Sequence, residues 1–139
     1  MPNFTNDELI DKALSVLNPQ QVGDRLFGDV ACALLTDQGN LFFGVCIDTG
    51  SGTGFCAEHS AIAAMITAGE YRIRKIVAVW KDGETACVLA PCGRCREFIH
   101  QVDLGNLDTE VVLDSGMSLK LRELLPYHDW FQKVGENAG

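Results

Sequence analysis

Two short segments combine thiols with a carboxylate in a pattern that can hold and use a metal ion. The first is Cys56-Ala57-Glu58, and the second is Pro91-Cys92-Gly93-Arg94-Cys95. Each stands where a helix is expected to begin, and the positive end of a helix lowers the pKa of a thiol, which must lose its proton to bind zinc. Cys92 and Cys95 are three residues apart, so one helical turn places both sulfur atoms on the same side. We therefore expect Cys56, Cys92 and Cys95 to bind Zn²⁺.

Three thiolates are one ligand short of a closed structural zinc site, and a catalytic zinc keeps its fourth position for water. A Glu in the first turn of a helix can reach back over a metal held at the helix N-terminus and take a proton from that water. Glu58 is therefore predicted to be the general acid and base of a hydrolytic reaction. Two alternatives remain open, a redox pair of Cys92 and Cys95 and a structural zinc site. The candidates for a fourth ligand in such a structural site are Cys32, Cys46, His59 and Cys87.

The hydrophobic pattern around these segments predicts helices and strands that alternate along the chain. A capping box at Thr5-Asn6-Asp7-Glu8 opens the first helix, and Asn18-Pro19 ends it. The alternation predicts a mixed sheet with helices on both faces. The glycine-rich loop at 49–54 lacks the Lys-Ser/Thr of a phosphate-binding loop and is interpreted as a flexible approach to an active site. The expected helices are 9–17, 57–68, 95–102 and 121–125, and the expected strands are 30–35, 41–47, 76–80, 86–90, 110–113 and 118–120.

Length and charge narrow the class of protein. The 139 residues suffice for a single domain, which we expect to span 1–139. A net charge of −8 disfavours a nucleic-acid partner, because an acidic surface repels phosphate backbones. No apolar run reaches membrane-spanning length, and the polar start of the chain is unlike a secretory signal. Six cysteines then fit reduced ligands and buried side chains of a cytoplasmic protein better than disulfides.

The two metal-binding segments resemble the signature of the cytidine deaminase superfamily, and the three-Cys form points to its free-nucleoside branch. The similarity extends to residues 33–39, to Gly44-Val45 and to 123–126. It implies a three-layer α/β/α sandwich with a mixed five-stranded sheet, bound Zn²⁺ and a small-molecule substrate. It further implies a homo-oligomer, commonly a tetramer, with active sites near the subunit interfaces.

The sequence departs from ordinary cytidine deaminases where they hold the ribose. Their Asn-x-Glu pair is replaced by Cys46 and Asp48, and the Arg that usually follows Cys-Ala-Glu is His59, so that Arg94 or Arg96 would offset the thiolate charge. Blasticidin S deaminases also depart from Asn-x-Glu and keep Pro-Cys-Gly-x-Cys-Arg, and the chain is most similar to that group. We expect a deaminase of a cytosine nucleoside or analogue, the alternative being a non-catalytic, zinc-stabilised scaffold. The expected substrate-binding residues are Cys46, Asp48, Ala57 and Trp130.

Overall fold

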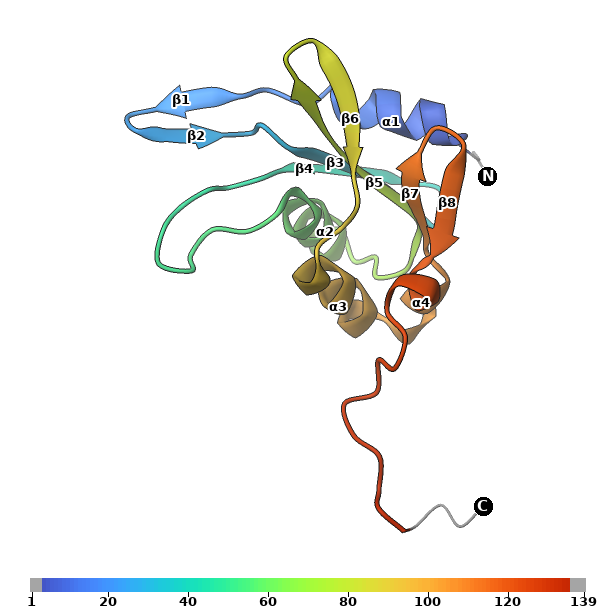
Figure 1. Ribbon diagram of the computed structural model, residues 1–139. Coiled ribbons are helices and arrows are strands. Elements are labelled where there is room, and N and C mark those ends of the chain that lie inside the picture. The colour runs from blue at the N-terminus through green and yellow to red at the C-terminus, as the bar shows by residue number, and fades with distance from the viewer. Residues whose placement is uncertain (1–3, 136–139) are drawn as a thin grey trace.

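Residues 4–135 are described by a computed structural model, in which helices cover both faces of one mixed sheet (Figure 1). The strand order is β4-β3-β5-β7-β8, and β6 also pairs with β5. The helices are α1 (Asn6–Leu14), α2 (Ala57–Thr67), α3 (Gly93–Val102) and α4 (Leu121–Leu124), with a 3₁₀ turn at Leu104–Asp108. The strands of the sheet are β3 (Ala31–Thr36), β4 (Leu41–Val45), β5 (Ile73–Asp82), β6 (Thr85–Leu89), β7 (Glu110–Asp114) and β8 (Met117–Lys120).

The sheet has six strands, whereas the resemblance to the cytidine deaminase superfamily implied five. The central strand β5 explains the difference. One edge of β5 pairs antiparallel with β3. The other edge is shared, because Lys75 and Ile76 pair in parallel with β7 while the segment from Ala78 to Asp82 pairs antiparallel with β6. Ten residues make β5 long enough for two short neighbours in succession. The chain leaves the sheet where β6 ends at Leu89, and the next residues lead to the start of α3.

Two apolar clusters, one on each face of the sheet, confirm the three-layer α/β/α arrangement. Side chains alternate along β3, so that Cys32 and Leu34 pack with α2 and α3 while Ala31 and Ala33 face α1. The helix α1 begins as predicted, since Thr5 and Glu8 form both hydrogen bonds of a capping box. Figure 1 shows α1 on one side of the sheet and α2 and α3 together on the other. The candidate metal-binding segments therefore share one layer.

A small hairpin was not predicted. Strands β1 (Gln20–Val22) and β2 (Arg25–Phe27) form a separate two-stranded sheet around a turn in which Gly23 has a φ of +62°. Half of its six strand residues are polar and almost all are exposed, and strands of three residues are too short to show a hydrophobic alternation in the sequence. The first helix also ends at Leu14, three residues earlier than expected.

Between residues 4 and 135, no helix has both the length and the apolar character needed to cross a lipid bilayer.

Candidate metal centre and substrate cavity

Two helix N-termini bring the three predicted thiols together. Cys56 is the N-cap residue of α2 and Cys92 is the N-cap residue of α3, both with extended backbone conformations. Neither side chain caps its own helix, so both Sγ atoms remain available as ligands. Cys95 lies one turn into α3 and is buried. The helix starts predicted from the sequence are therefore the elements that position the thiols.

The spacing of the sulfur atoms fits a tetrahedral zinc ion. The Sγ atom of Cys92 lies 3.9 Å from that of Cys56 and 3.6 Å from that of Cys95. Zinc–sulfur bonds of about 2.3 Å at tetrahedral angles place sulfur atoms about 3.8 Å apart. The three thiols thus need little rearrangement to hold one zinc ion.

The pKa values of the three thiols also indicate that a cation would stabilise the cluster. Burial and then the charge of Glu58 raise the pKa of the Cys95 thiol far above its ordinary value. Burial likewise raises the pKa of Cys56. Burial of Cys92 acts in the same direction, but hydrogen bonds from the Cys95 backbone and from the Cys95 and Cys56 thiols outweigh it and lower the pKa of Cys92. A divalent cation would stabilise all three thiolates, because its charge offsets their mutual repulsion.

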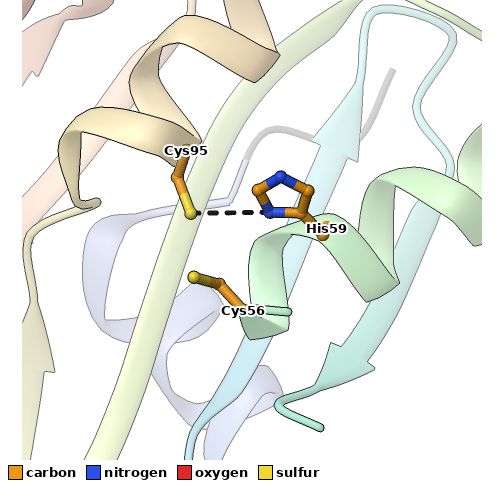
Figure 2. Close-up of side chains that lie close together, drawn as sticks. All are labelled: Cys56, His59 and Cys95. Carbon is orange, nitrogen blue, oxygen red and sulfur yellow. Dashed lines mark hydrogen bonds between the residues drawn. The ribbon is translucent and has the colours of Figure 1, made fainter. Parts of the chain in front are cut away.

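His59 is the fourth potential metal ligand of the cluster. Its Nδ1 atom lies 3.7 Å from the Cys95 Sγ atom, and the ligand atoms of Cys56, His59 and Cys95 all lie within 4.8 Å of one another. Figure 2 shows these three side chains converging from α2 and α3. The imidazole stacks on Phe98 with ring centroids 4.3 Å apart and an interplanar angle of 2°. The ring therefore has a fixed orientation toward Cys95.

The thiols open onto a cavity of about 270 Å³. This volume is close to the lower end of small-molecule sites, which span roughly 300–1,000 Å³. Glu58 lines the cavity and is only 6% exposed, and burial raises the pKa of its carboxyl group. The lining consists of Asp29, Val30, Cys46, Asp48, Phe55, Cys56, Ala57, Glu58, Ala78, Leu89, Ala90, Cys92 and Cys95.

His59 lies outside this cavity. It lines a separate depression together with Arg94, Glu97, Phe98 and Gln101. The three thiols and Glu58 thus line the cavity, whereas the imidazole does not, although its ligand atom lies within 4.8 Å of those of Cys56 and Cys95.

Most of the residues expected to bind substrate also line the cavity, namely Cys46, Asp48 and Ala57. Trp130 does not line it: its side chain is 77% exposed and its Nε1 atom donates to Glu97 at 3.4 Å. Figure 1 shows that the segment after α4 extends away from the helices of its own chain. This course explains why Trp130 does not reach the cavity of the same chain. A role of Trp130 at the site stays a prediction that depends on other subunits.

Asp29 is a cavity residue that the sequence analysis missed. It lies two residues before the start of β3, and its carboxylate accepts a hydrogen bond from the Cys46 thiol at 2.9 Å. Cys46 in turn lies 3.7 Å from the Asp48 carboxylate. The signal in the sequence was a lone carboxylate next to a buried strand, which is too common to indicate a site.

Arg96 has a structural task, and the expected offset of thiolate charge by this residue stays a prediction. Its guanidinium donates to the backbone carbonyls of Pro91 at 2.9 Å and Leu124 at 3.1 Å, and so ties the start of α3 to α4. Arg94 lies close enough to His59 to contribute, after burial, to the lowered pKa of that imidazole. Of the two candidates, Arg94 is therefore the arginine whose charge acts next to the thiol cluster.

The chain is thus an α/β/α protein whose three thiols cluster at two helix N-termini, where they could hold a metal ion, and open onto a small-molecule cavity. Residues 5–109 match the family described as the cytidine and deoxycytidylate deaminase zinc-binding region. The chain belongs to this family, and zinc is its metal.

Individual relatives agree with this assignment. A cytidine deaminase of Mycoplasma genitalium is 38% identical over 52% of this chain and 57% of its own length. A probable cytidine deaminase of Dictyostelium discoideum is 30% identical over 87% of this chain and 84% of its own. The crystal structure of cytidine deaminase from Mycobacterium leprae superposes with a TM-score of 0.73 and 26% identity, covering 89% of this chain and 99% of that one.

Proposed function

We propose that the chain hydrolytically deaminates a cytosine nucleoside or nucleoside analogue and releases ammonia. The observation that carries the proposal is the shared cavity, which the buried Glu58 carboxylate lines together with the thiols of Cys56, Cys92 and Cys95. A zinc site with a proton-transfer group beside it, both open to one small-molecule cavity, is what hydrolytic deamination requires.

Zinc held by the three thiolates would supply the acidity that makes a water molecule nucleophilic at neutral pH. Glu58 then accepts a proton from the attacking water and delivers it to the ring nitrogen N3 of cytosine. The water oxygen bonds to C4, and the C4–N bond breaks after a second proton reaches the amino group. Glu58 transfers this proton as well, from the new hydroxyl group on C4 to the amino nitrogen. One carboxylate therefore accepts and donates both protons. The products are the uracil nucleoside and ammonia, and atoms and charge balance.

The position of His59 supports a zinc site with three protein ligands and one open position. The imidazole lines a separate depression and stacks on Phe98, and it is not among the residues that line the substrate cavity. The Nδ1 atom would then serve as a hydrogen-bond partner of the Cys95 Sγ atom, 3.7 Å away, and the three thiols that line the cavity beside Glu58 would hold the zinc ion. A closed site with His59 as fourth ligand is the arrangement that would favour the non-catalytic alternative.

The finer substrate class follows from the sugar-side residues. The presence of Cys46 and Asp48 in the cavity supports a modified nucleoside, of the kind that blasticidin S deaminases accept, over ordinary cytidine. Cys46 donates to Asp29 and does not offer the donor and acceptor of an amide. We also propose a cytoplasmic location, since all six cysteines are free and the thiol cluster requires reduced sulfur.

The test is ammonia release from a panel of cytidine, deoxycytidine, blasticidin S, cytosine and guanine by the zinc-loaded chain. We expect turnover of at least one cytosine nucleoside or analogue, and no turnover of guanine. The matched control is Glu58→Gln, which should keep the fold and one zinc per chain but lose turnover by at least about a hundredfold.

Two results contradict the proposal. One is the absence of ammonia release from every cytosine compound by zinc-loaded protein, which would support the scaffold alternative. The other is unchanged turnover in Glu58→Gln. Loss of zinc in that variant would instead show that Glu58 is a ligand.

A further inference from the structure

A second cluster lies in the same cavity as the thiols and has no part in the chemistry proposed above. It consists of Asp29, Cys46 and Asp48, whose ligand atoms all lie within 4.8 Å of one another. The Cys46 side chain is 5% exposed and donates to the Asp29 carboxylate at 2.9 Å, with the Asp48 carboxylate 3.7 Å away. One wall of the substrate cavity therefore carries two carboxylates around one thiol.

Backbone hydrogen bonds fix this wall. The Gly28 amide donates to the Cys46 carbonyl, and the Cys46 amide donates to the Val30 carbonyl, so that Asp29 is held between two bonded neighbours. On the other side, Ile47 and Phe55 exchange both backbone hydrogen bonds, at 3.0 and 2.9 Å, and close the base of the loop that begins with Asp48. The carboxylates thus belong to a preformed surface, which makes their chemistry a determinant of specificity.

The wall presents only acceptors to a ligand. Burial and the hydrogen bond to Asp29 raise the pKa of Cys46 to about 11, so the thiol keeps its proton at neutral pH and commits it to Asp29. Carboxylates accept hydrogen bonds and, when ionised, donate none. A ligand group that meets this wall must therefore supply donors.

The negative charge of the wall is not offset by an ion pair. Within the described residues 4–135, neither Asp29 nor Asp48 takes part in a salt bridge. Arg25 reaches the same loop, but its guanidinium donates to the backbone carbonyl of Asp48 at 3.4 Å, not to the carboxylate. The wall thus carries negative charge and offers only hydrogen-bond acceptors. An ammonium group complements both features, because it carries positive charge and three donors and no acceptor.

We propose that Asp29 and Asp48 select a nucleoside whose sugar-side group carries a protonated amine. This inference rests on the proposed function, since it names the substrate class of the same cavity. The amine would lie against the two carboxylates while the cytosine ring faces Glu58 and the thiol cluster. A neutral hydroxyl would occupy the same place with a weaker hydrogen bond.

The test compares kcat/KM for cytidine, 3′-amino-3′-deoxycytidine and 5′-amino-5′-deoxycytidine at about pH 6.5, where an aliphatic amine is protonated. Wild type should favour at least one aminonucleoside over cytidine by about tenfold to a hundredfold, the range expected for replacing a neutral by a charge-assisted hydrogen bond. Asp48→Asn and Asp29→Asn should each remove most of that preference. The matched control Asp37→Asn changes an exposed carboxylate outside the cavity and should leave the preference unchanged.

Binding of the deamination products separates this inference from the proposed function. Calorimetry with uridine and the two corresponding aminouridines needs no turnover, and Asp48→Asn alone suffices if Asp29→Asn does not fold. If no cytosine compound is deaminated but an aminouridine binds more tightly in an Asp48-dependent way, the function fails and the inference stands. If cytidine is deaminated while neither aminonucleoside exceeds it in kcat/KM or binding, the inference is overturned and the function stands.

Discussion

Three thiols and a carboxylate lie within one small region, and at the scale of single residues the cost of ionising them together decides what the site can do. The raised pKa values of Cys56, Cys95 and Glu58 share one leading cause, burial, and the charge of Glu58 adds to it at both thiols. Ionising such a cluster without a counterion is costly. Metal binding and thiol ionisation are therefore coupled at this site.

The first residue-scale prediction concerns the ligands. Cys95→Ala removes a thiol that lies 3.6 Å from Cys92, and should lower zinc content from one ion per chain to a small fraction. The control Cys87→Ala changes a thiol in β6 that donates to the Thr85 carbonyl at 3.7 Å and lies outside the cavity lining, and should keep full zinc content. Elemental analysis of both purified variants after dialysis measures the difference. Equal zinc in the two variants would contradict the assignment of Cys95.

The second residue-scale prediction concerns the loss of stability at alkaline pH that follows from the buried Cys46 thiol. The native pKa of Cys46 is about 11, against about 8.5 for an unfolded thiol. The unfolded chain therefore ionises first, and the free energy of unfolding should decline from about pH 8.5 to 11 by about 1–3 kcal/mol. Cys46→Ser keeps a hydroxyl donor for Asp29 but does not titrate, so its decline should be shallower. Denaturant unfolding of both proteins at about pH 8 and pH 11 provides the comparison, and parallel declines would refute the assigned cause.

At the scale of elements, the contact between α2 and β4 sets the position of Cys56 and Glu58. A side chain at Gly44 would meet the backbone nitrogen of Ala61 at 2.2 Å and the Ser60 Cβ atom at 2.5 Å. Ser60 also donates to the Val45 carbonyl at 2.8 Å. The helix therefore lies directly on the strand, and only glycine permits this approach.

Gly44→Ala should consequently displace α2, lower the free energy of unfolding by about 1–3 kcal/mol and weaken zinc binding. The control Gly116→Ala introduces a methyl group that meets only an Asp114 oxygen at 3.8 Å, and should change neither property. Thermal unfolding and competition with a zinc chelator measure the two effects. If Gly44→Ala binds zinc as tightly as wild type, the close contact does not position the metal site.

The capping box of α1 gives a contrasting prediction, because this helix lies on the face of the sheet opposite the site. Thr5 accepts from the Glu8 amide at 3.1 Å, and Glu8 accepts from the Thr5 amide at 2.9 Å. Thr5→Ala should cost about 1 kcal/mol of stability and leave zinc content and turnover unchanged. Denaturant unfolding, metal analysis and kinetics on the same preparation test this separation of fold and site.

At the scale of the whole molecule, the outer face of α2 carries apolar surface that the rest of the chain does not bury. Ile62 and Met65 are fully buried, whereas Ile66 on the outer side is 37% exposed. The other exposed residues of this helix are Ala63, Ala64 and Thr67. Apolar surface of this kind is typical of a helix that contacts another subunit.

We therefore predict a homo-oligomer, with a tetramer expected from the resemblance in sequence, and Ile66→Lys should shift the mass toward smaller species. Light scattering coupled to gel filtration at micromolar concentrations measures the mass of both proteins. A monomeric wild type would contradict the prediction. The same measurement bears on Trp130, whose exposed position leaves a role at the site to an assembled form.

The local features could be predicted from the sequence, because each depends on residues that are neighbours along the chain. These include the helix starts at Cys56 and Cys92, the one-turn spacing of Cys92 and Cys95, the buried strand β3 and the capping box at Thr5. The three-layer fold was likewise predicted, from the alternation of helices and strands and from the resemblance. The hairpin of β1 and β2 was not predicted, because strands of three mostly exposed residues are too short to show a periodic signal.

Contacts between residues that are far apart in the sequence emerged from the three-dimensional structure alone. Asp29 and Cys46 are 17 positions apart, and their contact follows from the register of β3 and β4, which a one-residue slip would abolish. His59 is separated from Cys95 by 36 positions and meets it because α2 and α3 share one face of the sheet. Likewise, β5 accepts both β6 and β7 on one edge, a choice set by its length and by the partners available in space. Contacts of this kind depend on packing between elements, and no local pattern of residues encodes them.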